Sequence, residues 1–165
     1  MDDKTNKKYV LMVCVDNTCR SPIAEAVLHD MIVKQDLQAE WDVESAAIEA
    51  WHVGAHPDER ALSVLHKHKI KYTNLVRRIK LEDFEKFNYI VGMDQSIMAS
   101  LKLLEPHYAK AKLLMLGDFL IGLKPDERFI EDPYYEMGEG PFDKIYEQCT
   151  LACANFLNQA RNDEI

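Results

Sequence analysis

Short apolar runs alternate along this chain with segments of helical periodicity. Four runs have the length and continuity of strands covered on both faces, at residues 9–14, 41–48, 89–93 and 111–116. Each is followed by a segment in which apolar residues recur every three or four positions, at residues 23–32, 58–68, 97–104 and 142–157. Pro57-Asp58 is the predicted start of the second of these helices, and Asp94 is placed to cap the third. Strands and helices that alternate in this way form a parallel sheet with helices on both faces. We therefore predict an α/β fold with a four-stranded parallel sheet, and such folds bind ligands beyond the carboxyl ends of their strands.

Chain length and continuity favour a single domain. The sequence has 165 residues, of which 47% are hydrophobic, and this is enough material for one continuous core. No internal repeat, low-complexity tract or Gly/Ser linker divides it, and the one loop-rich region is 117–141. We expect residues 1–165 to form one domain.

Charge and hydropathy argue against two classes of partner. With 20 Lys and Arg against 28 Asp and Glu, the formal net charge is −8, which would repel a nucleic-acid backbone. The apolar run at residues 9–15 is too short to span a bilayer, and no small-residue cleavage site follows it. We expect a soluble cytoplasmic protein without nucleic-acid or membrane partners, in which the four cysteines are reduced.

The sequence VCVDNTCRSP at residues 13–22 joins the first predicted strand to the first predicted helix. Ser21 is the expected N-cap of that helix, and Pro22 its first residue, where the missing N–H costs nothing. A short loop that enters a helix can turn several backbone N–H groups inward, and the helix end adds partial positive charge. The Cys14–Arg20 loop is therefore predicted to bind inorganic phosphate or a similar oxyanion.

Cys14 and Arg20 are the candidate reactive residues of this loop. The inward N–H groups and the positive helix end that would bind an oxyanion also favour the thiolate form of a cysteine. This makes Cys14 a candidate nucleophile. The guanidinium of Arg20 presents a planar fork that matches two oxygens of a phosphoryl group and would stabilise the transition state. The alternative is a core cysteine beside a solvated arginine. The buried strand before the loop and the Ser-Pro helix start after it favour phosphate chemistry.

Four motifs extend this interpretation, namely CRSPIAEAVL at 19–28, VESAA at 43–47, GMD at 92–94 and EDPYY at 131–135. In order and approximate spacing they resemble the low-molecular-weight protein tyrosine phosphatases, and the resemblance covers residues 8–160. It implies a phosphotyrosine protein phosphatase I-like fold and an acid phosphatase-type enzyme. Such an enzyme hydrolyses phosphotyrosine and aryl phosphate monoesters through a cysteinyl-phosphate intermediate, without a metal or other cofactor.

The resemblance assigns three catalytic roles. Cys14 would attack phosphorus, Arg20 would hold the equatorial oxygens, and Asp132 would protonate the leaving phenolate and then activate water. From the residues alone, Asp132 before Pro133 is typical of a turn, and only the resemblance favours a general acid.

The resemblance also implies binding and supporting residues. Those that surround the substrate would be Val15, Asp16, Asn17, Thr18, Cys19, Ser21, Trp51 and Tyr134. Trp51 and Tyr134 would form the walls of a slot for a phenyl ring. Asn17, Ser21 and Ser45 would brace the loop, with Ser21 bonded to the Cys14 sulfur. Cys14 and Cys19 would form a reversible disulfide under oxidation, and Tyr134 and Tyr135 match positions that are phosphorylated in the family.

Four positions depart from the family pattern. Asp16 replaces a glycine and introduces a carboxylate into the loop, which predicts weaker catalysis and an altered loop geometry. Asn74 stands at a histidine position, Ile48 at a threonine position and Glu136 at a glycine position. These three substitutions affect the expected rate and substrate choice more than the reaction type.

Two alternatives remain beside a phosphatase that acts on phosphotyrosine proteins as a monomer or weak dimer. One is a phosphate-binding or scaffold protein in which Asp16 has impaired catalysis, although such a protein needs no acid at Asp132. The other is an arsenate reductase, whose chemistry needs further cysteines near the loop. Cys149 and Cys153 lie instead on the apolar face of the last predicted helix, which favours a core position.

Overall fold

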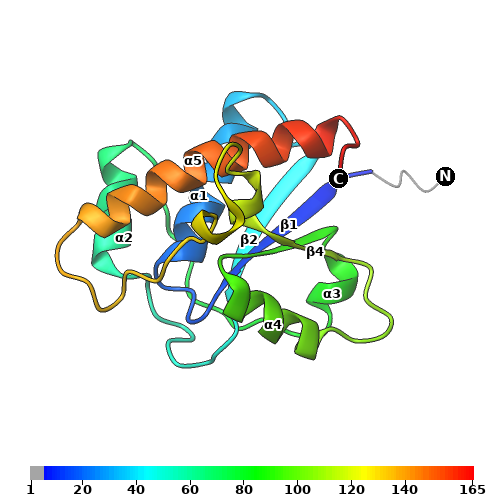
Figure 1. Ribbon diagram of the computed structural model, residues 1–165, viewed down its shortest axis with the longest axis horizontal. Helices are drawn as coiled ribbons and strands as arrows, with labels where there is room; N and C mark the ends of the chain where they lie inside the picture. Colours follow the sequence, from blue (N-terminus) through cyan, green and yellow to red (C-terminus); the bar gives the residue numbers. More distant parts are fainter. Residues whose placement is uncertain (1–5) are drawn as a thin grey trace.

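The computed structural model describes residues 6–165, so the first five residues of the predicted domain lie outside it. Four parallel strands form one sheet in the order β2-β1-β3-β4 (Figure 1). They are β1 at Lys8–Cys14, β2 at Trp41–Ala47, β3 at Tyr89–Gly92 and β4 at Lys112–Met115. The predicted four-stranded parallel sheet is confirmed, and the predicted strand bounds differ from the observed ones by at most one residue at each end.

Helices cover both faces of the sheet. They are α1 at Arg20–Lys34, α2 at Glu59–Lys67, α3 at Asp83–Lys86, α4 at Gln95–Leu104 and α5 at Gly140–Arg161, with 3₁₀ turns η1 at Leu116–Phe119 and η2 at Pro125–Glu127. Figure 1 shows α1 and α5 side by side on one face, with α3 and α4 toward the other. The sequence predicted the four longer helices but not α3 or the two 3₁₀ turns.

Two helix starts follow the capping rules. The Asp58 carboxylate accepts the backbone N–H of Arg60 at the start of α2, at 2.8 Å. The Asp94 carboxylate accepts the N–H of Ile97 at the start of α4, at 2.9 Å. Each bond satisfies a backbone donor that has no partner within its helix, so both predicted starts are confirmed.

The core fills both faces of the sheet, under α1 and α5 on one side and under α3 and α4 on the other. Residues 10–14 of β1 are at most 1% exposed because strands and helices cover the strand on every side. On α5, Cys149 and Cys153 are fully buried, and both are free thiols. The prediction that they belong to the core is confirmed.

Strands β2, β1 and β3 end at the same edge of the sheet. Cys14 pairs in register with Ala47 of β2, and Val13 pairs with Gly92 of β3. The residues just beyond these ends, Ile48 and Asp94, therefore lie beside the beginning of the Cys14–Arg20 loop. No helix within residues 6–165 is long and apolar enough to cross a membrane.

Candidate active site

The backbone of the Cys14–Arg20 loop is fixed from outside through its carbonyl groups. The N–H of Ile48 donates to the Cys14 carbonyl at 3.0 Å, the N–H of Glu49 to the Val15 carbonyl at 2.8 Å, and the N–H of Asp58 to the Thr18 carbonyl at 2.9 Å. In a trans peptide the N–H of the next residue points opposite to the carbonyl. These outward bonds therefore direct the following N–H groups to the inside of the loop, where an oxyanion would accept them.

The Cys14 sulfur lies at the base of this loop with two donors beside it. Cys14 is 1% exposed, and its Sγ accepts the backbone N–H of Ser21 at 3.4 Å. The Ser21 hydroxyl oxygen lies 3.0 Å from the sulfur and accepts the side-chain amide of Asn17 at 2.8 Å. Because Asn17 occupies the oxygen, the Ser21 hydrogen is directed to the sulfur. Two hydrogen-bond donors therefore converge on one sulfur.

The predicted helix-cap role of Ser21 is wrong. Helix α1 begins at Arg20, Cys19 occupies the N-cap position, and no side chain caps the helix. Pro22 is therefore the third helical residue and not the first. The Ser21 hydroxyl is free for the sulfur because it does not bond to the helix backbone.

Arg20 lies in the interior and not on a solvated surface. It is 2% exposed, and its Nη1 donates to the Asp94 carboxylate at 2.7 Å and to the Ile130 carbonyl at 2.9 Å. Burial lowers the pKa of Arg20, but the charge of Cys14 and the bond to Asp94 outweigh it and raise the pKa above its ordinary value. The guanidinium is thus held charged and in a fixed orientation.

Asp132 comes to the site from a distant segment. Its Oδ2 lies 3.8 Å from Nη2 of Arg20, while its Oδ1 accepts the backbone N–H of Tyr134 at 3.0 Å. The side chain is 47% exposed, so water can reach the carboxyl group. The structure therefore places a carboxyl group beside the Arg20 guanidinium, and the general-acid role of Asp132 stays a prediction.

Asn17 is held in a conformation that non-glycine residues seldom adopt. Its φ is 59°, in the left-handed region. The side-chain amide also donates to the Ser45 hydroxyl at 2.9 Å, and its oxygen accepts the backbone N–H of Arg77 at 3.2 Å. Ser45 in turn lies 3.3 Å from the hydroxyl of Tyr72. These bonds keep the loop in its curved form, which supports the predicted bracing roles of Asn17 and Ser45.

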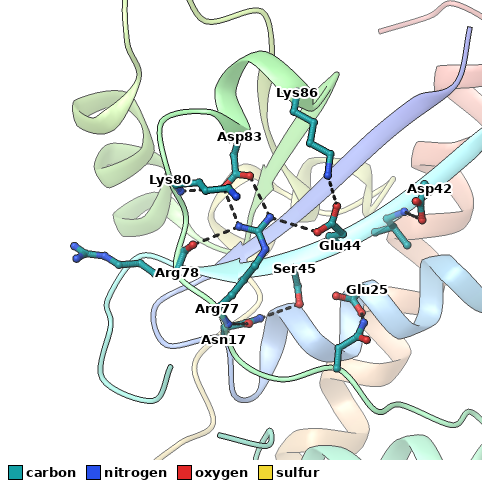
Figure 2. A network of polar contacts seen from close by, with 12 residues as sticks. Asn17, Glu25, Asp42, Glu44, Ser45, Arg77, Arg78, Lys80, Asp83 and Lys86 are labelled. Carbon is teal, nitrogen blue, oxygen red and sulfur yellow. Dashed lines mark hydrogen bonds and ion pairs between the residues drawn. The ribbon is translucent and has the colours of Figure 1, made fainter. Parts of the chain in front are cut away.

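Arg77 connects this brace to a buried carboxylate (Figure 2). Its guanidinium donates to both oxygens of Asp83, at 2.9 and 3.2 Å, and lies 3.6 Å from Glu44. Asp83 is 1% exposed and also accepts the backbone N–H of Lys80 at 2.9 Å. The Arg77 backbone, which contacts Asn17, is thereby anchored to α3.

Asp16 fits the loop without backbone strain. In this loop only Asn17 has a positive φ, so the backbone at Asp16 does not need the conformational freedom of glycine, and the altered loop geometry stays a prediction. The Asp16 Oδ1 accepts the backbone N–H of Thr18 at 3.3 Å, and its Oδ2 lies 3.9 Å from Nε2 of His52. The Asp16 carboxylate therefore accepts one of the backbone N–H groups of the loop.

The other predicted substrate residues lie in or beside the loop. Thr18 and Cys19 are 5% and 2% exposed, and burial raises the pKa of Cys19 to about 12, so its thiol remains protonated. Trp51 and Tyr134 are 68% and 39% exposed on the segments after β2 and before α5. Val15 is half-buried. The Cys14–Cys19 disulfide and the aromatic slot stay predictions.

The three other positions that differ from the family pattern have defined surroundings. Asn74 donates to the carboxylate of buried Glu25 at 2.8 Å, and burial raises the pKa of Glu25. The Ile48 side chain is mostly buried, and the Glu136 carbonyl accepts a bond from Arg60. None of these contacts places a new charge at the Cys14 sulfur.

Sequence reasoning missed four contributors to the site. Asp94 was expected only as a helix cap, yet one of its oxygens caps α4 and the other binds Arg20. Its position after β3, the neighbour of β1, is a signal that could have found it. The Ile130 carbonyl, Arg77 and Arg60 come from segments whose proximity no sequence pattern indicates. No group of three or more His, Cys, Asp or Glu side chains in the part of the chain that the structure describes is arranged to hold a metal ion.

Comparisons with known proteins agree with this geometry. The family described as "Low molecular weight phosphotyrosine protein phosphatase" matches residues 9–164. Low molecular weight phosphotyrosine protein phosphatase 2 of Drosophila melanogaster is 56% identical over 165 residues, covering 100% of this chain and 99% of the relative.

Two solved structures have the same fold. A protein tyrosine phosphatase from Entamoeba histolytica superposes with a TM-score of 0.89 at 29% identity, covering 96% of this chain and 100% of that one. The drosophila arginine phosphatase superposes with a TM-score of 0.86 at 37% identity, covering 92% of this chain and 96% of that one.

Proposed function

The chain belongs to the low molecular weight phosphotyrosine protein phosphatase family, and from this premise we propose that it hydrolyses phosphotyrosine through a phosphoenzyme on Cys14. The observation that carries the proposal is the convergence of three groups. The Cys14 sulfur has two donors, the Arg20 guanidinium is fixed, and the Asp132 carboxyl lies beside that guanidinium. A pure phosphate-binding or scaffold protein needs the guanidinium and the loop amides but not the acid.

In the first step the Cys14 thiolate attacks phosphorus, and the bond between phosphorus and the phenolic oxygen breaks. The inward N–H groups of the loop and Arg20 hold the three equatorial oxygens as charge develops on them. Asp132 transfers its proton to the leaving oxygen, so that a neutral phenol departs. The products of this step are the phenol and a cysteinyl phosphate.

In the second step water attacks the phosphorus of the cysteinyl phosphate. Asp132, now a carboxylate, accepts a proton from that water, and the sulfur–phosphorus bond breaks. The Ser21 hydroxyl, directed to the sulfur by Asn17, stabilises the thiolate as it leaves. Inorganic phosphate is released and the enzyme returns to its starting state.

The substrate side chain is proposed to lie between Trp51 and Tyr134. Both rings are exposed on segments that flank the loop, and flat rings bind a phenyl group well. Because the Cys14 sulfur lies at the base of the loop, a phosphoserine is too short to reach it. We further propose that the chain is one domain that acts in the cytoplasm as a monomer or weak dimer.

The substrate class is tested with peptides that differ only in the phosphorylated residue. We expect kcat/KM on a phosphotyrosine peptide to exceed that on the phosphoserine peptide by about a hundredfold or more, because misplacing the reacting atoms by about 1 Å costs that much. Equal kcat/KM values on the two peptides would contradict the proposed slot between Trp51 and Tyr134. Reduction of arsenate by the same preparation would favour the reductase alternative.

Phosphoarginine is the second candidate substrate. The drosophila arginine phosphatase shares the fold at 37% identity. In this chain the carboxylates of Asp16 and Asp132 lie in the loop and beside Arg20, where they can pair with the N–H groups of a substrate guanidinium. A higher kcat/KM on a phosphoarginine peptide than on the phosphotyrosine peptide, lost in Asp16→Asn, would favour this candidate.

Asp16→Gly is expected to raise kcat/KM on p-nitrophenyl phosphate about tenfold. At an effective dielectric of about 20, a carboxylate about 5 Å from the bound dianion costs about 3 kcal/mol per unit charge, and solvent reduces this for a partly exposed group. Glycine also removes the acceptor of the Thr18 N–H. Asp16→Asn removes the charge and keeps an acceptor, so it separates the two effects. An unchanged or lower kcat/KM in both variants would show that Asp16 is no handicap.

A further inference from the structure

The segment that carries Asp132, residues 131–138, is here called the acid loop. It is largely exposed, and Tyr135 and Met137 are each 93% exposed. Its internal hydrogen bonds are short-range, from the N–H of Tyr134 to Asp132 and from the N–H of Glu136 to the Pro133 carbonyl. Among residues 6–165, the hydrogen bonds that reach the acid loop from elsewhere in the chain come from one side chain, that of Arg60.

Arg60 holds the acid loop at two backbone carbonyls. Its Nη1 donates to the Glu136 carbonyl at 2.6 Å, and its Nη2 donates to the Tyr134 carbonyl at 3.1 Å. The guanidinium carbon lies 4.5 Å from the centre of the Phe142 ring, at the start of α5. The planar fork of an arginine suits this task because it presents several donors in a fixed geometry.

The Arg60 guanidinium is also connected, through Asp58, to the Cys14–Arg20 loop. Nε and Nη2 of Arg60 donate to the two oxygens of Asp58, each at 3.1 Å. The backbone N–H of Asp58 donates in turn to the Thr18 carbonyl at 2.9 Å. One short chain of contacts therefore fixes the position of the acid loop relative to the loop that holds the nucleophile.

Tyr134 connects the Arg60 guanidinium to the Asp132 carboxyl. Its carbonyl accepts from Arg60, and its N–H donates to Oδ1 of Asp132, which leaves Oδ2 toward Arg20. We propose that Arg60 is a positioning residue for the reaction, which orients the Asp132 carboxyl toward the leaving group by holding Tyr134 and Glu136. This inference rests on the proposed role of Asp132 as general acid. Proton transfer depends on such placement because displacements near 1 Å reduce it strongly.

The experiment compares two substrates that differ in their need for the acid. Phenyl phosphate releases a phenol whose pKa is about 10, close to that of tyrosine, and requires protonation of the leaving oxygen. p-Nitrophenyl phosphate releases a stabilised phenolate that departs with little help. The quantity measured is kcat/KM on each substrate, because it reports the step in which the ester bond breaks.

Arg60→Ala is expected to lower kcat/KM on phenyl phosphate about tenfold more than on p-nitrophenyl phosphate. In Arg60→Lys the extra loss of kcat/KM on phenyl phosphate should be smaller than in Arg60→Ala. A lysine supplies charge and donors, but it lacks the planar fork of an arginine. The control is Lys67→Ala on the same helix, which removes an ion pair of 2.7 Å with Asp143 of α5 and does not contact the acid loop. We expect this control to lower kcat/KM equally and only slightly on both substrates.

Asp132→Asn separates the two proposals. If Asp132→Asn shows the substrate-dependent loss and Arg60→Ala does not, the positioning role of Arg60 is wrong. The general-acid role of Asp132 is then still supported. If Asp132→Asn lowers both substrates equally, Asp132 is not the acid and the role of Arg60 is contradicted with it. Equal losses on both substrates in Arg60→Ala, with a lowered Tm, would assign Arg60 to stability alone.

Discussion

Cys14→Ser is expected to abolish turnover of p-nitrophenyl phosphate, with kcat lower by a factor on the order of 10⁵. Serine keeps the volume and the contact with Ser21, but its hydroxyl is not ionised near neutral pH and is a poor nucleophile toward phosphorus. The loop amides and Arg20 remain, so the variant should still bind inorganic phosphate. Steady-state kinetics give kcat, and competition by phosphate confirms that the loop is formed.

The matched control is Cys149→Ala, at a cysteine that is fully buried in α5 away from the loop. It should keep kcat while lowering the Tm by a few degrees, because it leaves a small cavity in the core. If Cys14→Ser retains more than about a tenth of the wild-type kcat, with its fold intact, Cys14 is not the nucleophile and the mechanism is wrong.

Arg20→Lys is expected to lower kcat/KM by a factor on the order of 10³. The wild-type guanidinium uses Nη1 for Asp94 and Ile130, and in the proposed mechanism Nε and Nη2 remain for the phosphoryl oxygens. An ammonium group keeps the charge but cannot make these contacts together. Much of the loss should appear in kcat, since the fork stabilises charge that grows as the reaction proceeds.

The control for Arg20→Lys is Arg161→Lys at the exposed end of α5, which should leave kcat/KM unchanged. A loss in Arg20→Lys that appears only as a higher KM, with kcat preserved, would mean that Arg20 binds the substrate without stabilising the transition state. A loss smaller than about tenfold would mean that charge alone suffices at this position.

The fold was largely predictable because its signals are local. The apolar run that ends at Cys14 is buried on all sides in β1, and the Asp58 and Asp94 carboxylates cap helices where the sequence placed them. Parallel order then follows from the alternation of strands and helices. The α3 helix escaped prediction because four residues give no measurable periodicity.

The site was predictable only in part. Cys14, Ser21 and Arg20 are close in sequence, so one motif identified them, although the helix start was misplaced because the Ser21 hydroxyl serves the sulfur and not the backbone. Asp132 was assigned from resemblance alone. Its approach to Arg20 depends on tertiary packing, which residue spacing does not encode.

Supporting contacts were beyond sequence reasoning for the same reason. Arg77 reaches Asn17 through its backbone N–H, a group that every non-proline residue carries. Arg60 binds backbone carbonyl groups, which every residue carries, so no residue type in the sequence marks the contact. Asp16 was noticed, but its bond to the Thr18 N–H depends on a rotamer that only the structure specifies.

The central claim is that the sulfur of Cys14 becomes covalently phosphorylated during turnover. Acid quenching during hydrolysis of p-nitrophenyl phosphate, followed by tryptic digestion and mass spectrometry, tests this directly. Cleavage after Lys8 and Arg20 gives one peptide that contains both Cys14 and Cys19, and fragmentation distinguishes them. We expect one added phosphoryl group on Cys14, which is lost in Cys14→Ser. Turnover without any phosphorylated cysteine, or with the group on Cys19, would contradict the account.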